Sequence, residues 1–182
     1  MVSERGFSLI ELLVVLALLG FLLSLAVPFA SSWSNQSKLQ DAAQLLQQGI
    51  GRTKALALRN HAGMTSDQAA AKLCLKNNKD NERLELKLYQ AEKTNNTEPN
   101  NTEPNKPAKC YSDDKNLVWQ ADLPNKVAIE ITRDKSNQTI AFTCLAMNNR
   151  SLQIELTDSD SCQKGSRYTL SIGDDNEAFT FN

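Results

Sequence analysis

The chain begins with a long hydrophobic stretch that has one charged side chain at its entrance. Residues 12–30 carry no charge, and neither lysine nor arginine occurs between Arg5 and Lys38. An apolar helix of this length can cross a bilayer core of roughly 30 Å. Glu11 lies at the mouth of the stretch, and an acidic side chain at the centre of a membrane helix costs about 2.5–3.5 kcal/mol. Glu11 therefore needs a partner, and the nearest cation would be an amino group created by cleavage before Phe7.

Residues 6–11, which read GFSLIE, and the apolar run behind them resemble the class III signal of type IV prepilins and type II secretion pseudopilins. In that family, a peptidase cuts after the glycine, methylates the new amino-terminal phenylalanine and leaves the hydrophobic helix in place. The resemblance implies that Gly6 ends the leader, that Phe7 becomes the amino terminus and that Glu11 is the fifth-position glutamate of the family. Pro28 stands where many pilins also carry a proline, and its missing backbone donor predicts a kink.

Two other interpretations of the amino terminus compete with this one. A cleaved secretory signal has a basic region, an apolar core of 7–15 residues and a small-residue cleavage site, for which residues 24–26 or 28–30 could serve. The apolar run is too long for that class and begins beside Glu11. A plain signal anchor also leaves Glu11 unexplained, so the prepilin interpretation is favoured.

Composition restricts what the rest of the chain can do. About 150 of the 182 residues remain for one soluble domain, which is an ordinary size for a single core. Twenty basic and twenty-one acidic residues give a net charge of −1, so the chain has no global basic surface for nucleic acid. A single histidine, His61, and the lack of a CxxC pair argue against a metal site or another cofactor. No nucleophile and base occur together, so we expect no enzymatic activity and no catalytic residue.

The four cysteines point to an oxidising compartment such as the periplasm. Four cysteines allow three pairings, and we favour Cys74–Cys110 together with Cys144–Cys162. Each bond would close a loop long enough for about 3–4 kcal/mol of stabilisation in the chain-entropy treatment. A catalytic cysteine is the alternative, but no histidine partner supports it.

A second periodicity follows the apolar run and predicts an amphipathic helix. Apolar and small residues recur at steps of three and four, which defines one stripe of a helix. We expect this stripe to pack on the core of its own domain. Its members are Leu39, Ala42, Ala43, Leu46, Ile50, Thr53, Leu56 or Ala57, and Asn60. Gly49 and Gly51 each weaken such a helix by up to about 1 kcal/mol, and they indicate either close packing or a bend.

Beyond His61 the sequence alternates with the period of half-buried strands. The predicted strands cover residues 72–76, 83–89, 117–120, 127–131, 139–144, 152–156, 168–172 and 178–181. Residues 77–81, 148–150 and 173–176 have the composition of turns. Residues 95–104 repeat NNTEP twice and lack apolar side chains other than proline, so we expect a disordered loop over 93–109. The predicted fold is α+β, with a long helix packed on an antiparallel, two-sheet β-domain.

These segments predict four parts of the chain. They are a leader (1–6), a transmembrane and assembly helix (7–30), its amphipathic continuation (31–61) and a periplasmic β-rich head (62–182). The expected location is the inner membrane, with one membrane pass and the head in the periplasm, followed by the pilus surface after assembly.

Residues 52–61 resemble the helix end of the FimT, FimU and GspH group of minor pilins and pseudopilins, although Lys54 replaces the usual acidic residue. This resemblance implies a minor pilin of an initiation or tip complex, with the prepilin peptidase, other major and minor pilins and the inner membrane as partners. A GspH-like pseudopilin is the first alternative, but Leu9-Ile10-Glu11 is closer to the pilus members. A DNA-binding pilin of the FimT kind is the second. Residues 172–182 carry three acids and no base where that branch has Gly-Arg-x-Arg, so DNA is not an expected partner.

Overall fold

The computed structural model describes residues 8–78, 83–93, 105–111, 114–133, 138–156, 162 and 164–180, without the side chains of 25–32, 78 and 114. Contacts divide the chain into two compact units, residues 1–37 and residues 38–182. The first helix and the first three strands are α1 (Leu9–Arg59), β1 (Ala71–Asn78), β2 (Arg83–Gln90) and β3 (Leu117–Asp122), with a short 3₁₀ turn at Asp114–Asn116. The later strands are β4 (Ala128–Thr132), β5 (Thr139–Ala141), β6 (Cys144–Met147), β7 (Gln153–Ile154), β8 (Arg167–Ile172) and β9 (Asp175–Thr180).

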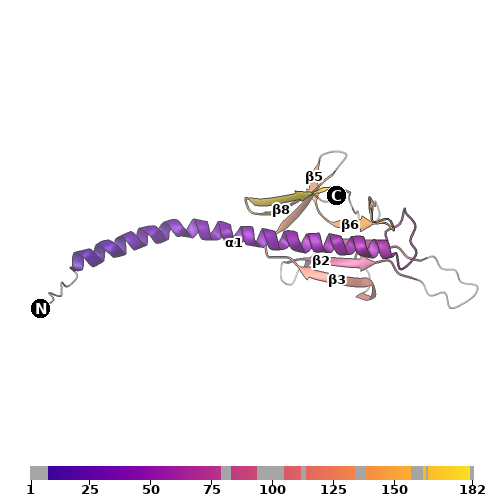
Figure 1. The fold of residues 1–182 in the computed structure, drawn as a ribbon, viewed down its shortest axis with the longest axis horizontal. Helices are drawn as coiled ribbons and strands as arrows, with labels where there is room; N and C mark the ends of the chain where they lie inside the picture. Colours follow the sequence, from indigo (N-terminus) through magenta and orange to yellow (C-terminus); the bar gives the residue numbers. More distant parts are fainter. Residues whose placement is uncertain are drawn as a thin grey trace, which may run out of the picture. The chain divides into compact units, whose positions relative to one another are not determined.

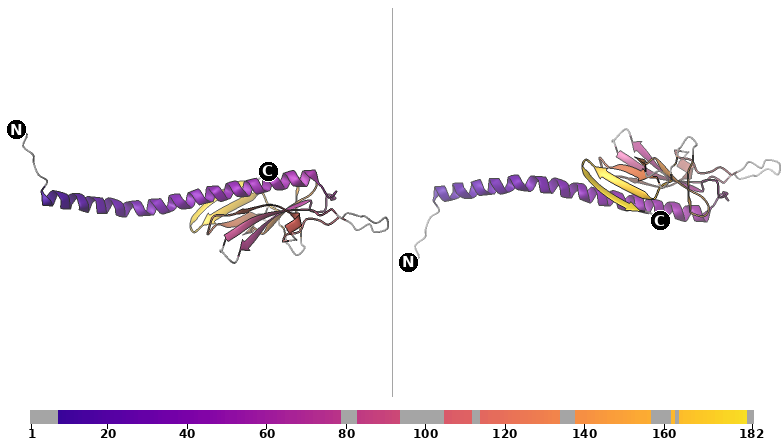
Figure 2. Two further views of the ribbon diagram at one scale, coloured as in Figure 1. Left: turned by 90° about the horizontal axis from the view of Figure 1, so that it is seen from below. Right: turned by 90° about the horizontal axis from the view of Figure 1, so that it is seen from above.

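The β-strands of the second unit form two antiparallel sheets. One sheet has the order β3-β2-β1-β6-β7 and the other the order β5-β4-β8-β9. Seen from below and from above, the part of α1 that belongs to this unit runs along one side of the strands (Figure 2). The predicted α+β fold with a helix on a two-sheet antiparallel structure is confirmed.

The amphipathic stripe predicted from the sequence forms the helix's contribution to the core. Leu39, Leu46 and Ile50 are at most 2% exposed, and the stripe alanines are buried beside them. The sequence left open whether Leu56 or Ala57 belongs to the stripe. Ala57 is buried, whereas Leu56 is only partly buried. Asn60 ends the helix, because its positive φ of 41° stops the α-helical path. Its side chain exchanges two hydrogen bonds with the backbone of Met64.

The two helix glycines have different surroundings. A Cβ at Gly49 would lie 3.1 Å from both Leu73 Cδ2 and Trp119 Cζ3, whereas a Cβ at Gly51 would have no neighbour within 4 Å. Gly49 is therefore a close-packing position, where α1 approaches β1 and β3. The buried Thr53 hydroxyl next to this contact donates a hydrogen bond of 2.7 Å to the Gly49 carbonyl.

One predicted strand is wrong, because the segment that it covers passes from one sheet to the other. Residues 139–144 were expected to form a single strand, but Thr139–Ala141 and the strand that begins at Cys144 belong to different sheets. At the crossing, the Phe142 amide donates to Ile129 and the Thr143 carbonyl accepts from Leu75. The backbone thus changes partners from one sheet to the other, which a continuous apolar run cannot reveal.

The extent of the expected disordered loop is also corrected. Residues 94–104, which include the tandem repeat, lie outside the described residues, but residues 105–109 pack on the head. The Ala108 amide donates to the Ala69 carbonyl at 2.9 Å, and Ala108 is 1% exposed. Lys106 forms a two-way backbone bridge with Glu92. This segment is ordered because its backbone groups find partners on the rim of the sheet.

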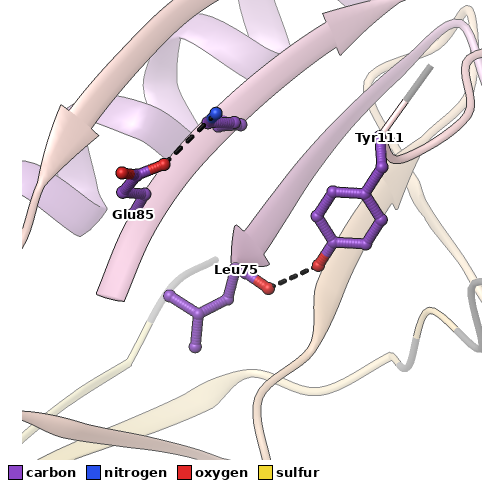
Figure 3. A network of polar contacts seen from close by, with 4 residues as sticks. Leu75, Glu85 and Tyr111 are labelled. Carbon is purple, nitrogen blue, oxygen red and sulfur yellow. Dashed lines mark hydrogen bonds and ion pairs between the residues drawn. The ribbon is translucent and has the colours of Figure 1, made fainter. Parts of the chain in front are cut away.

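Tyr111 fixes the next few residues to the end of β1. Its hydroxyl donates a hydrogen bond of 2.6 Å to the Leu75 carbonyl (Figure 3). On the neighbouring strand, Lys87 and Glu85 form an ion pair of 3.2 Å. Because Cys110 and Cys74 are the adjacent residues in sequence, the hydrogen bond and the disulfide hold the same two segments together.

Candidate functional site

The described part of the amino terminus begins with a helix start built from Ser8 and Glu11. The Ser8 carbonyl accepts hydrogen bonds from the amides of Glu11 (3.0 Å) and Leu12 (3.2 Å), and the helix begins at Leu9. The Glu11 carboxylate reaches back and accepts the Ser8 amide at 3.4 Å. Glu11 thus satisfies a backbone donor that the helix leaves open.

This geometry is one half of a capping box, in which the acidic residue three positions after the N-cap binds the N-cap amide. The positive end of the helix dipole also favours a carboxylate in the first turn. In the sequence, the position of Glu11 at the mouth of the apolar run pointed only to pairing with an amino group at residue 7. The pattern Ser8-x-x-Glu11 before an apolar run was available as a signal for the cap, so this role of Ser8 could have been found from the sequence.

The helix behind Glu11 exposes apolar side chains in all directions. Twelve large hydrophobic residues between positions 9 and 23 are at least 49% exposed. Those residues are Leu9, Ile10, Leu12, Leu13, Val14, Val15, Leu16, Leu18, Leu19, Phe21, Leu22 and Leu23. A helix that is apolar all round requires an apolar environment, either lipid or other helices.

Other residues predicted for this site are less fully described. Gly6 and Phe7 lie outside the described residues, and of Pro28 only the backbone is described, as part of α1. The predicted kink at Pro28 stays a prediction. Among the residues that the structure describes, no helical stretch is both long and apolar enough to span a membrane.

The cysteines form two disulfides in the second unit, Cys74–Cys110 and Cys144–Cys162. These are the pairs favoured from the sequence. Cys74 and Cys144 lie directly opposite each other in β1 and β6, so the two bonds are neighbours. The sulfur atoms of Cys110, Cys144 and Cys162 consequently lie within 4.8 Å of one another. Each of these sulfurs is bonded to another sulfur, whereas metal binding by cysteine requires a thiolate.

His61 is exposed at the end of α1 and lines a small cavity of about 180 Å³ with Arg59 and Ala70. None of the described lining residues of this cavity is a cysteine, a serine or an acid. Among the described residues that line this cavity, none is a residue type that could act as a nucleophile beside His61. The features that single out a functional site lie instead at the start of α1.

Comparison with known proteins agrees with that location. Residues 1–27 match one protein family, the prokaryotic N-terminal methylation motif. The match covers Gly6, Phe7 and Glu11 and ends before Pro28. No match was found among curated proteins or among solved structures. The motif supports a type IV pilin-like protein that is processed by a prepilin peptidase and assembles with other pilins.

Proposed function

We propose that this protein is a minor pilin, which assembles through its amino-terminal helix into a type IV pilus as part of an initiation or tip complex. The observation that carries the proposal is the methylation motif on residues 1–27, with Glu11 at the start of a helix that is apolar on every side. Such a helix is suited to lie first in lipid and then among the helices of other subunits. Its role is structural, and we propose no enzymatic activity.

The cap at Glu11 suggests how processing and assembly are linked. Cleavage after Gly6 would leave a positive amino group on Phe7, whose nitrogen lies only three covalent bonds before the Ser8 amide nitrogen. Because the Glu11 carboxylate already binds that amide, it is within reach of the new cation. Pairing with the amine of the same subunit, or with that of a neighbour, offsets the cost of holding either charge in an apolar environment.

The same features support an inner-membrane precursor with its head in the periplasm. The apolar run gives the helix a lipid-compatible surface, and Trp33, which is 78% exposed, follows its end. Tryptophan is enriched at membrane interfaces, where its ring is apolar and its N–H can bind water. Two disulfides in the head fit an oxidising compartment. After assembly, the head would lie on the pilus surface.

Removing the charge of Glu11 tests the proposal. We expect Glu11→Gln to enter the membrane fraction normally and to be lost from sheared surface filaments, because a neutral amide cannot pair with the Phe7 ammonium. Glu4→Gln is a matched control, since Glu4 belongs to the leader that cleavage removes. Equal amounts of the Glu11 variant and the unsubstituted protein in filaments would contradict the proposal.

The main alternative is a GspH-like pseudopilin of a type II secretion system, because both classes share the methylation signal. The Leu9-Ile10-Glu11 sequence favours the pilus side. Deletion of the gene separates the two: loss of surface pili supports the minor pilin, and loss of exoprotein secretion with intact pili supports the pseudopilin. DNA is not a proposed partner, since the β8–β9 region that would have to bind it contains Asp174, Asp175 and Glu177.

A further inference from the structure

Two adjoining cavities form one basic groove at the end of α1. The first has a volume of about 260 Å³ and lies between the last turns of the helix and β3, with Arg52 and Arg59 on its helix side and Trp119 on its sheet side. The second is the small cavity of about 180 Å³ beside His61. Arg59 and Leu56 line both cavities. The two cavities are therefore one continuous surface, which we call the arginine groove.

The arginine groove is open to solvent and has an apolar floor. Arg52 and Arg59 are exposed, and Val118 is 45% exposed although it is a large apolar residue in a strand. Leu88 of β2 forms part of the floor. β3 stands at the edge of its sheet, beside the end of α1 (Figure 1). Another chain can therefore approach the groove from the free edge of β3.

The electrostatics of the arginine groove favour an acidic ligand. The Arg52 guanidinium carbon lies 5.1 Å from the centre of the Trp119 ring, which holds the cation in place by a cation–π contact. None of the described residues that line the two cavities is acidic. A guanidinium presents a planar set of donors that matches a carboxylate, and an apolar floor reduces the screening of such a pair by water.

The spacing of the two arginines indicates the form of the ligand. Arg52 and Arg59 are seven residues apart in α1, which corresponds to about 10.5 Å along a helix. An extended chain advances about 3.3 Å per residue and places alternate side chains on one face. Carboxylates two or four residues apart would thus be separated by about 6.6 or 13 Å, which brackets the spacing of the arginines. An extended acidic segment of a protein fits this pattern.

Nucleic acid and anionic lipid fit the arginine groove less well. Arg52 and Arg59 are the only lysine or arginine residues among the described residues that line the two cavities. Proteins that bind DNA commonly make about 6–10 phosphate contacts, and anionic membrane surfaces are bound by clusters of about 4–8 basic residues. Arginine and aromatic residues around an apolar centre are instead typical of protein–protein interfaces.

We propose that the arginine groove binds an acidic segment of a different pilin subunit. Two carboxylates of that segment pair with Arg52 and Arg59, and one of its apolar side chains covers Val118. The contact joins the heads of two neighbouring subunits in the initiation or tip complex. Because the two partners differ, the contact forms once and does not repeat along a filament. The inference rests on the proposed function, since it takes the partner from the same assembly.

Photo-crosslinking in the native host tests this contact on the full-length chain. A benzophenone amino acid replaces Val118, and the adducts are mapped by mass spectrometry. We expect an adduct with another protein that carries the methylation motif, on a peptide with two acids two or four residues apart. Arg59→Glu should lower its yield by about tenfold and Arg59→Gln by about threefold. Arg150→Glu is the matched control, because it reverses the charge of an exposed arginine outside the groove, and it should leave the yield unchanged.

Exchanging the charges across the contact tests the pairing itself. One acid of the mapped peptide is changed to lysine in the partner, which alone should lower the yield by about tenfold because like charges then face each other. Combining this change with Arg59→Glu should return the yield to nearly that of the unsubstituted pair. An unchanged yield in both Arg59 variants overturns the pairing, as does failure of the combination to restore the yield for either acid.

A second crosslinker position separates this inference from the proposed function. The same amino acid at Leu16 reports on helix packing with any pilin, because Leu16 is 60% exposed in the apolar segment. Pilin adducts from Leu16 without one from Val118 overturn the groove as a docking site and leave the proposed function standing. Absence of pilin adducts at both positions overturns both. A Val118 adduct with a second copy, with residues 94–104 of the same chain, with a peptide that lacks acids, with lipid or with nucleic acid overturns the proposed ligand.

Discussion

Alanine substitution at Gly49 and at Gly51 should change the stability of the head in opposite directions. Both residues lie in α1, two positions apart, and replacing glycine by alanine in a helix interior gains about 0.4–1 kcal/mol. At Gly51 nothing lies within 4 Å of the new Cβ, so the gain should appear in full. For a chain of this size, it corresponds to a rise in melting temperature of roughly 1–4 °C.

At Gly49 the same gain is opposed by overpacking. The new Cβ would lie 3.1 Å from the Trp119 ring and 3.1 and 3.3 Å from the two Leu73 methyl carbons, where carbon atoms prefer about 3.5–4.0 Å. Inserting a methyl group into a well-packed core costs about 1–3 kcal/mol. The net effect is a loss of about 0.5–2 kcal/mol and a melting temperature lower by about 1–8 °C.

Thermal unfolding of the full-length protein in detergent measures this difference. Near-ultraviolet circular dichroism follows the loss of packing around Trp119, and each variant is compared with the unsubstituted chain. The Gly51 variant is the control for helix propensity, because it carries the same gain without the contact. Equal stabilisation by both substitutions would refute the close approach of α1 to β1 and β3.

Three further variants test other contacts of the head, each by the same unfolding measurement. Gly165→Ala should destabilise it by about 1–3 kcal/mol or more, because the new Cβ would collide with the Thr132 carbonyl oxygen, a backbone atom that cannot move aside; an unchanged melting temperature would contradict that geometry. Tyr111→Phe removes one hydrogen bond at an exposed site and should lower the free energy of unfolding by about 0.5–1 kcal/mol. A loss of several kcal/mol would contradict the assignment of a single exposed hydrogen bond to the Tyr111 hydroxyl. Joint replacement of Cys74 and Cys110 by alanine opens a 36-residue loop and should cost about 4 kcal/mol, whereas a negligible loss would show that the loop is held by other contacts.

The helix and most strands could be predicted because their burial follows a local period. The stripe from Leu39 to Ala57 is buried as its spacing of three and four residues predicts, and β2 covers the predicted strand 83–89 with one residue added. Other features depend on contacts between distant segments. Residues 139–144 divide between two sheets because Phe142 and Thr143 bind different strands, and no local pattern encodes that change of partner.

The choice between close packing and a bend at the helix glycines needed the structure for the same reason. Gly49 and Gly51 look alike in sequence, and only the positions of Leu73 and Trp119 distinguish them. At the amino terminus the motif and its spacing were readable from the sequence alone. What the structure adds is the hydrogen bond from the Ser8 amide to the Glu11 carboxylate. This bond holds the carboxylate close to the predicted site of cleavage.

The mass of the mature protein tests the central claim most directly. The protein is purified from host membranes, and its intact mass and amino-terminal peptide are determined by mass spectrometry. The account predicts a chain that lacks residues 1–6 and begins with N-methylated Phe7, and that becomes uncleaved and unmethylated in cells without the prepilin peptidase. A chain that retains Met1 in normal cells, or one cut within residues 24–30, would contradict it.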